Sequence, residues 1–263
     1  MAVNLFFRSF GGGGGGVAPV VVLHGLLGSS RNWMTAGAEL ASDRRVYALD
    51  LRNHGDSPHT PGHSYPLMVE DVIAWMEARK IGRADFLGHS MGGKTAMRLA
   101  VDFPERVRRL VVVDIAPREN PPYNQRAFAA MNALPFSRIR SRKEAEGFLE
   151  ERIPSWAFRQ FLLTNFVRDG SGGFTWKVNL PVLTDNLRQL GKSPLEENER
   201  FEGPALFLRG GQSDFVRDED FALIKHHFPA YRLETLEGCG HNPHMEQRGL
   251  FNAGVRAFLD AAG

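Results

Sequence analysis

The 263-residue chain is long enough for one large α/β domain, or for one such domain with an inserted segment. Its ordinary composition argues against a disordered or fibrous protein, and a net charge of +2 is too small to indicate nucleic-acid binding. The single cysteine, Cys239, rules out an intrachain disulfide. Together with the absence of a signal peptide and of an apolar run of ~20 residues, it predicts a cytoplasmic protein without a membrane span.

The first part of the chain alternates short apolar runs with amphipathic stretches. Strands are predicted at residues 3–10, 17–23, 45–51, 84–87 and 110–115, and helices at residues 32–41, 65–80 and 94–103. Six consecutive glycines at 11–16 predict a flexible loop between the first two strands. Regular alternation of strand and helix indicates a parallel sheet that is covered by helices on both faces.

The pattern changes after Pro117. Helices are predicted at residues 125–134, 143–152 and 156–167, followed by a short strand at 174–178. Strands resume at residues 205–208 and 231–236, and a helix at 250–262 ends the chain. We therefore predict an α/β core made of residues 1–117 and 204–263, with a mainly helical cap of residues 118–203 inserted into it.

Ser90 lies between two glycines where the strand at 84–87 approaches the helix at 94–103. In such a G-x-S-x-G sequence, a sharp turn holds the serine in a strained backbone conformation and exposes its hydroxyl at the top of the sheet. Gly88 and Gly92 fit this turn because side chains two residues before and after the serine would collide as it closes. The sequence therefore predicts that Ser90 is a nucleophile.

A serine hydroxyl needs a neighbouring base, and His241 is the candidate because it lies in the glycine-rich loop after the last predicted strand. His241 and His244 do not indicate a metal site, since Asn-Pro between them breaks a helix and no third ligand is near. The developing oxyanion needs two N–H donors. The candidates are the backbone of Met91, directly after the nucleophile, and that of Leu26, in the loop after an earlier strand.

Four segments together resemble the α/β-hydrolase superfamily and, within it, the small YbfF-type esterases of bacteria. They are HGLLGSS at 24–30, DLRNHGDSP at 50–58, GHSMGGK at 88–94 and VDIAP at 113–117. The resemblance covers nearly the whole chain and implies an α/β-hydrolase fold: a mostly parallel eight-stranded sheet with helices on both faces and a helical cap between strands 6 and 7. It also implies that no cofactor is needed, that segment 50–58 is a structural turn, and that the substrates are short- or medium-chain acyl esters or thioesters.

The acid of the expected catalytic triad departs from the common family pattern. Most relatives place it in G-x-x-D after the seventh strand, but counting from Gly210 puts Ser213 at that position and Asp214 one residue later. Asp114 is the other candidate, because a carboxylate that ends an apolar strand is costly unless it is paired. The sequence favours Asp114 and leaves Asp214 as the alternative.

The sequence thus predicts a serine hydrolase that acts through an acyl-enzyme intermediate. Carbon–carbon bond hydrolases and perhydrolases share the elbow and are alternatives, as is a ligand-binding receptor with residual hydrolysis. The basic residues Arg138, Arg140, Arg142 and Lys143 allow two interpretations, a solvated helix start or an attraction for acyl-CoA; no oligomeric state is indicated. Some apolar side chains of the cap should line a cleft above Ser90, the candidates being Phe128, Met131, Trp156, Phe158, Phe161, Leu162 and Phe166.

Overall fold

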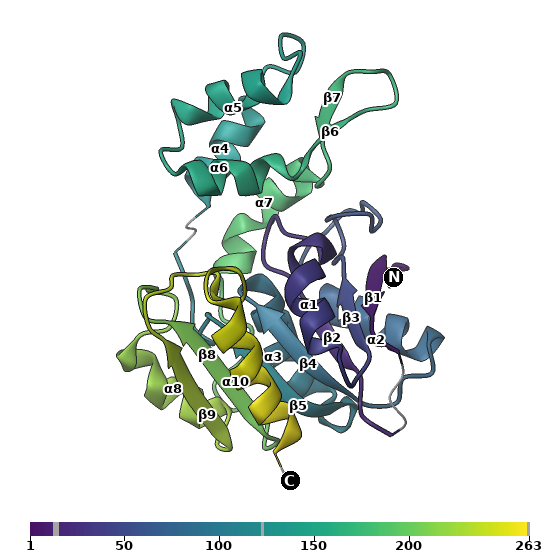
Figure 1. Ribbon diagram of the computed structural model, residues 1–263, viewed down its shortest axis with the longest axis vertical. Helices are drawn as coiled ribbons and strands as arrows, with labels where there is room; N and C mark the ends of the chain where they lie inside the picture. The colour runs from purple at the N-terminus through teal and green to yellow at the C-terminus, as the bar shows by residue number, and fades with distance from the viewer. Residues whose placement is uncertain (13–15, 122–123, 262–263) are drawn as a thin grey trace.

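A mostly parallel sheet forms the centre of the molecule, which the computed structural model describes for residues 1–12, 16–121 and 124–261 (Figure 1). In the order of hydrogen-bonded neighbours, its strands are β1 (Phe7–Phe10), β3 (Val46–Leu49), β2 (Val20–Leu23), β4 (Ala84–His89), β5 (Val107–Val113), β8 (Ala205–Gly210) and β9 (Tyr231–Leu236). β1 runs antiparallel to β3, and the other pairs are parallel. The predicted α/β class with a mostly parallel sheet is confirmed.

Within the described residues the sheet has seven strands, one fewer than the eight that the resemblance implies. The chain before β1 is engaged in other contacts. The Phe6 N–H donates to Ser57 Oγ at 2.8 Å, and the Phe6 carbonyl accepts the Asp50 N–H at 2.9 Å. These bonds tie the residue before β1 to the turn that follows β3, and β1 is the edge strand of the sheet.

Both faces of the sheet are covered by helices. Successive residues of β2 point in opposite directions, so that Val21 packs into one apolar cluster while Val20 and Val22 pack into the other. All three valines are fully buried, which explains why this strand has a continuous apolar run instead of an alternating pattern. The covering helices are α2 (Tyr65–Ala78), α3 (Met91–Asp102) and α8 (Phe221–His227) on the Val21 side, and α1 (Met34–Leu40) and α10 (Arg248–Asp260) on the other.

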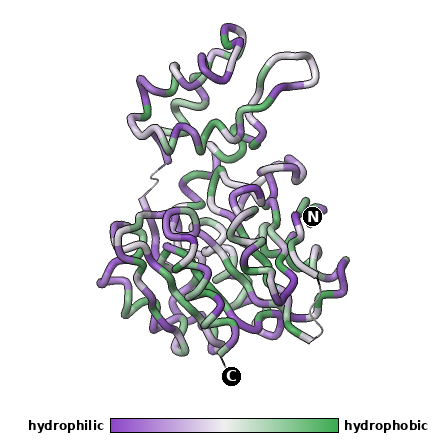
Figure 2. The backbone as a smooth tube through the Cα atoms, viewed as in Figure 1, coloured by the Kyte–Doolittle hydropathy of each residue, from purple (hydrophilic) through white to green (hydrophobic). Residues whose placement is uncertain are grey.

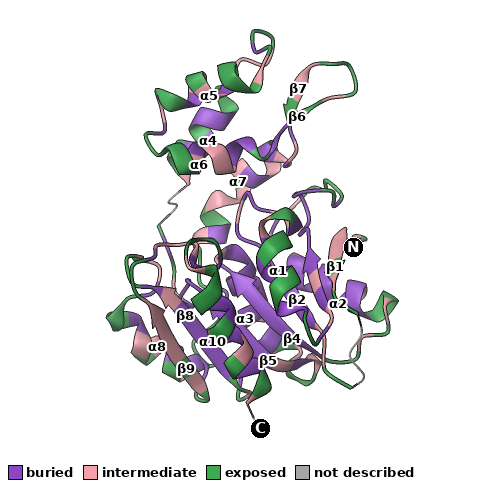
Figure 3. Cartoon of the chain, viewed as in Figure 1, coloured by how far each residue is buried: buried purple, intermediate pink, exposed green. Residues whose placement is uncertain are grey.

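The distribution of apolar residues follows these layers. Apolar segments run along the strands of the sheet, and polar segments follow the outer loops (Figure 2). The strands β2, β4 and β5 are buried almost throughout, whereas the outward sides of α1 and α10 are exposed (Figure 3). Burying one valine or leucine side chain contributes about 1.5–3 kcal/mol, so the buried strands contribute substantially to stability. Among the described helices, none has both the length and the apolar character that a membrane span requires.

The segment between β5 and β8 forms most of a third apolar cluster, which includes Phe128, Met131 and Leu162. Figure 1 shows most of this segment above the sheet, with α7 between them. We call residues 118–203 the cap. Its elements are α4 (Gln125–Asn132), α5 (Arg142–Glu150), α6 (Trp156–Leu163), the hairpin of β6 (Phe166–Arg168) and β7 (Phe174–Trp176), and α7 (Leu180–Gly191).

Two parts of the cap differ from the predicted elements. The helix predicted at 156–167 ends at Leu163, and Phe166–Arg168 is a strand paired with β7. The apolar run continues through both elements, so the pattern alone could not separate them. Asn165 lies at the boundary and donates from Nδ2 to the Leu27 carbonyl at 2.8 Å, which fixes the cap to the loop after β2. The helix α7 was not predicted; Pro181 lies in its first turn, where proline is tolerated.

The segment 50–58 forms a buried turn after β3, as the resemblance implies. Asp50 accepts the N–H groups of Ser30 at 2.6 Å and Asp56 at 2.8 Å. The guanidinium of Arg52 forms a two-bond ion pair with Asp71 of α2, with Nε–Oδ2 at 2.6 Å and Nη2–Oδ1 at 2.8 Å. Both partners are buried, and their contacts give them a structural function in joining the turn to α2.

Breaking this pair should destabilise the protein strongly. Asp71→Asn is expected to lower the free energy of unfolding by about 3–5 kcal/mol, because it leaves the Arg52 guanidinium buried without a counter-charge. Urea unfolding monitored by circular dichroism measures the change. Glu151→Gln, at an exposed pair with Arg152, is the matched control and should change stability by less than about 0.5 kcal/mol. An equally small effect of Asp71→Asn would show that the turn does not depend on the pair.

Candidate active site

Ser90 lies in a sharp turn between β4 and α3. Its backbone has φ 53° and ψ −116°, a left-handed conformation that non-glycine residues rarely adopt. Space around the turn is minimal: a Cβ atom on Gly88 would collide with the backbone of Gly92, and one on Gly92 would collide with the Leu23 carbonyl. The turn is held by the Ser90 N–H, which donates to the Val113 carbonyl at 3.0 Å. The geometry is that of a nucleophile elbow.

Asp114 follows β5 and is fully buried, in a left-handed conformation with φ 50°. Three donors surround its carboxylate. Oδ2 accepts the Nδ1–H of His241 at 2.7 Å and the hydroxyl of Ser213, and Oδ1 accepts the Gly210 N–H at 2.9 Å. Because Nδ1 of His241 is the donor, the neutral ring carries its free lone pair on Nε2.

Asp214 does not share this environment. Its side chain is exposed in the loop after β8, and its backbone carbonyl accepts a bond from Arg118 at 3.1 Å. The residue before it, Ser213, occupies the position that the family pattern gives to the acid, and it contacts Asp114 instead of His241. The sequence alone predicted no function for Ser213. Its hydroxyl, at the position where most relatives have the acid, could have indicated a hydrogen bond to an acid from another strand.

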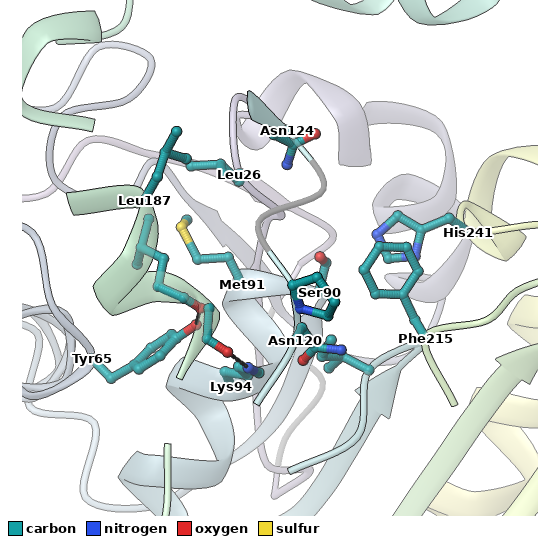
Figure 4. A pocket seen from close by; sticks show the side chains of 14 residues that line it. Leu26, Tyr65, Ser90, Met91, Lys94, Asn120, Asn124, Leu187, Phe215 and His241 are labelled. Carbon is teal, nitrogen blue, oxygen red and sulfur yellow. Dashed lines mark hydrogen bonds between the residues drawn. The ribbon is translucent and has the colours of Figure 1, made fainter. Parts of the chain in front are cut away.

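The ring of His241 is held from two further sides. Phe215 stacks on it with ring centroids 3.9 Å apart and an interplanar angle of 21°. His89, the residue before the elbow serine, donates from Nε2 to the His241 carbonyl at 2.8 Å. Both Ser90 and His241 line the same cavity, and Figure 4 shows a ring nitrogen of His241 turned toward the Ser90 hydroxyl. The arrangement brings the predicted base beside the predicted nucleophile.

The two expected oxyanion donors flank the same cavity. Met91 is the first residue of α3, so its N–H has no acceptor within the helix, and Leu26 lines the cavity from the loop after β2. The next N–H in that loop, of Leu27, donates to His54 Nε2 at 3.2 Å. His24 fixes the start of the loop by accepting the Leu51 N–H on Nε2 at 3.0 Å.

The other histidines near the site are neutral. Burial holds the pKa values of His54 and His89 well below their ordinary range, and burial also lowers that of His24 despite the nearby charge of Asp50. Burial lowers the pKa of His63 and His244 to about 3. His244 stacks on Trp33 at 4.3 Å between centroids. In the described ranges, no group of three His, Cys, Asp or Glu side chains is arranged to hold a metal ion.

Two cavities meet at Ser90. The larger, of about 380 Å³, extends under the cap and is lined by Trp33, Phe158, Phe161 and Met245 among others. The smaller, of about 110 Å³, extends from His241 toward Tyr65 and Lys94. Of the seven apolar cap residues considered from the sequence, Phe158 and Phe161 line the larger cavity and Trp156 is 65% exposed; four are buried within the cap, namely Phe128, Met131, Leu162 and Phe166.

The basic residues of the cap lie at the start of α5 and are exposed. Arg140 donates to the Ser137 carbonyl at 2.8 Å, and Arg142 donates to the Leu163 carbonyl at 2.6 Å. Ser90 and the cavity residues belong to other elements. These contacts are those of a solvated helix start.

The fold and the arrangement around Ser90 define an α/β hydrolase. Residues 18–247 match the family of the alpha/beta hydrolase fold, and the chain belongs to this family. The sn-1-specific diacylglycerol lipase ABHD11 of Mus musculus is 39% identical over 248 residues, which cover 91% of this chain and 80% of the relative. Esterase YbfF of Escherichia coli K12 is 34% identical over 247 residues, with 92% and 93% covered.

Among solved structures, a marine microorganism esterase superposes with a TM-score of 0.94 and is 35% identical, with 98% of this chain and 100% of that chain covered. The predicted resemblance to YbfF-type esterases is therefore confirmed. The relatives also confirm the predicted enzyme class: the chain is a carboxylic ester hydrolase.

Two conservative substitutions compare the candidate acids. Asp114→Asn is expected to reduce kcat by about 10⁴, because an amide at this position leaves the imidazole of His241 in the wrong tautomer. Asp214→Asn, the matched control, should reduce kcat by less than about tenfold, since it changes an exposed side chain. Steady-state hydrolysis of a simple ester by the two variants measures both effects. The reverse ranking would overturn the assignment of the acid to Asp114.

Proposed function

We propose that this hydrolase cleaves short- to medium-chain carboxylic esters or acyl thioesters through an acyl-enzyme intermediate, with Ser90 as nucleophile. One observation carries the proposal: His241 is hydrogen-bonded through Nδ1 to the buried Asp114 carboxylate and turns its other side toward Ser90. The ring can therefore accept the proton of the Ser90 hydroxyl. An adjacent base of this kind is what a serine hydroxyl needs to react at neutral pH.

In the first half of the reaction, Ser90 Oγ attacks the acyl carbonyl carbon while Nε2 of His241 takes the hydroxyl proton. The oxyanion accepts the N–H groups of Met91 and Leu26, each of which acts on charge that develops in the transition state. The proton on Nε2 then passes to the departing alkoxide or thiolate, which leaves as the alcohol or thiol. Water repeats the sequence on the acyl-enzyme and releases the carboxylic acid and free Ser90.

Asp114 and Ser213 act through His241 in this scheme. The Asp114 carboxylate holds the Nδ1–H tautomer and stabilises the imidazolium that forms when the ring accepts a proton. Ser213 donates to the same carboxylate oxygen and keeps it oriented. Gly210 holds the second oxygen, so the carboxylate cannot turn away from the ring. Asp114 and Ser213 are therefore positioning residues, because neither touches the reacting atoms.

The larger cavity supports the assignment of the substrate class. Its walls include Trp33 from the core and Phe158 and Phe161 from α6. The cavity therefore lies between the cap and the core, next to Ser90. An apolar chain that enters this cavity gains ~0.8 kcal/mol for each methylene buried. We therefore assign residues 118–203 the function of a cap that selects the apolar chain, and residues 1–117 and 204–263 the function of a catalytic core. Two relatives named above, an esterase and a diacylglycerol lipase, are consistent with apolar ester substrates.

The nucleophile is tested by substitution and by covalent labelling. Ser90→Ala is expected to lower kcat by about four to six orders of magnitude while the protein stays folded. A fluorophosphonate probe should modify the native enzyme at Ser90, as peptide mass spectrometry would locate, and should leave the variant unmodified. Ser137→Ala, at an exposed cap position, is the control and should keep both activity and labelling. Activity in a pure Ser90→Ala preparation would refute the mechanism.

The chain-length preference tests the cap. In a series of ethyl esters from acetate upward, kcat/KM should rise by roughly fourfold for each added methylene until the larger cavity is full. Phe158→Ala should flatten this increase, since it removes part of the apolar wall. Trp156→Ala, on the same helix but largely exposed, should leave the profile unchanged. A preference of the native enzyme for acetate over all longer acyl groups would contradict the assignment.

A further inference from the structure

The smaller of the two cavities at Ser90 has a polar end. It begins at Ser90 and His241 and reaches Tyr65, Lys94 and Asn120 at its base. Figure 4 shows Lys94 and Tyr65 at the end opposite to His241. The walls between are mostly apolar, with Leu26, Ile115, Leu187, Leu190 and Phe215. A group that enters from Ser90 therefore passes an apolar section before it meets nitrogen and oxygen atoms.

Lys94 places a buried amino group at this end. It lies four residues after Ser90 on α3 and is only 2% exposed. Its ammonium donates to the carbonyls of Gly191 at 3.0 Å and Lys192 at 2.7 Å, at the C-terminal end of α7. An ammonium has three N–H groups, and in the described part of the chain no carboxylate lies within 4.0 Å of this one. In its charged form the amine thus has backbone partners but no counter-ion.

Asn120 lies beside the same helix end, because its backbone N–H donates to the Gly191 carbonyl at 2.7 Å. Its side chain is 6% exposed and lines the cavity, yet neither Oδ1 nor Nδ2 has a hydrogen-bond partner in the described residues. Leaving a buried polar group without a partner costs about 1–3 kcal/mol, so such groups call for an explanation. An amide that faces a cavity beside a buried cation is explained by a ligand that accepts hydrogen bonds.

The ligand's charge and size follow from these residues. A carboxylate would give Lys94 its counter-ion and would accept a bond from Asn120 Nδ2. Because a cavity of about 150 Å³ holds benzene, one of 110 Å³ has room for about four or five non-hydrogen atoms. Beyond the reacting carbonyl, this corresponds to one or two methylenes and a carboxylate. Burial, together with the charge of Arg118, lowers the pKa of Lys94 to about 7, against the opposing effect of Glu119; a bound carboxylate would favour the charged form.

We propose that Lys94 and Asn120 recognise the distal carboxylate of a short dicarboxylic acyl group, so that monoesters or monothioesters of three- or four-carbon dicarboxylic acids are preferred substrates. The proposal rests on the function proposed above, with Ser90 as nucleophile. For such an ester the dicarboxylic acyl group enters the smaller cavity and the alcohol part lies in the larger one, whereas an apolar acyl chain without a carboxylate enters the larger cavity. A neutral acyl group gains no polar contact in the smaller cavity and leaves the buried cation without a counter-ion, which is the basis of discrimination.

Two esters of nearly equal shape test the preference. Ethyl hydrogen succinate and ethyl 4-methylpentanoate differ in that an isopropyl group replaces the carboxylate. Native enzyme should have the higher kcat/KM for the succinate, measured by ethanol release. Lys94→Met should lower the ratio of the two kcat/KM values by about 30-fold or more, as expected when one partner of a buried charge pair is removed. The ratio cancels any general loss of activity.

Asn120→Asp is the second variant, because it keeps the side-chain shape and gives Lys94 a carboxylate partner within the protein. It should abolish the preference for the succinate ester while the thermal midpoint is retained. Lys225→Met, at an exposed position on α8, is the matched control and should leave the ratio unchanged. A native preference for the neutral ester, or a ratio that neither Lys94→Met nor Asn120→Asp alters, would overturn the proposal.

Binding without turnover separates this proposal from the proposed function. Calorimetric titration of the Ser90→Ala protein with ethyl hydrogen succinate should give saturable binding, and the Ser90→Ala, Lys94→Met double variant should lose it. If the native enzyme hydrolyses the neutral ester but the Ser90→Ala protein does not bind the succinate ester, the carboxylate site is wrong and the esterase function stands. If the Ser90→Ala protein binds but the native enzyme hydrolyses neither ester, the function fails instead.

Discussion

The buried carboxylate of Asp114 is the point on which the arrangement of three loops depends. A carboxylate that is removed from water and left unpaired costs several kcal/mol, so the folded state must supply donors to it. The donors come from two other strand ends: the end of β8 and its following loop, with Gly210 and Ser213, and the loop after β9, with His241. The requirement to satisfy one anion thus fixes the relative positions of loops that are far apart in the sequence.

The parallel sheet brings these loops to one edge. Val113 pairs with His89 on one side and with Leu208 on the other, so the chain leaves β4, β5 and β8 at the same level. Since alternate residues of each strand pack into different apolar clusters on the two faces, a shift by one residue would move every side chain to the opposite cluster and disrupt the packing of both. The burial that stabilises β4 in the sheet therefore also fixes the position of the strained turn at Ser90.

Local patterns were sufficient to place Ser90, His241, Met91 and Leu26 around one cavity, because each belongs to a short motif with a fixed position at a strand end. The choice between Asp114 and Asp214 could not be made from the sequence alone. It depends on how the loop after β8 turns, and that loop is shaped by a carboxylate from another strand. The cap was harder to predict, since an apolar run such as that of α6 and β6 is compatible with either a helix or a strand when tertiary contacts decide. The expectation of an eighth strand came from the resemblance, whereas the sheet in the described residues has seven.

The buried histidines have a consequence for the whole molecule in acid. His24, His54, His63, His89 and His244 are all held neutral in the folded protein, with pKa values below the ordinary 6.5 of the unfolded chain. Below about pH 6.5 the unfolded chain therefore binds more protons than the folded one, and folding becomes less favourable as the pH falls. Each histidine contributes up to about 1.4 kcal/mol per pH unit until its folded-state pKa is reached. The packing that excludes solvent from these histidines thus also makes the folded state lose stability in acid. This loss begins well above the pH at which most carboxylates titrate.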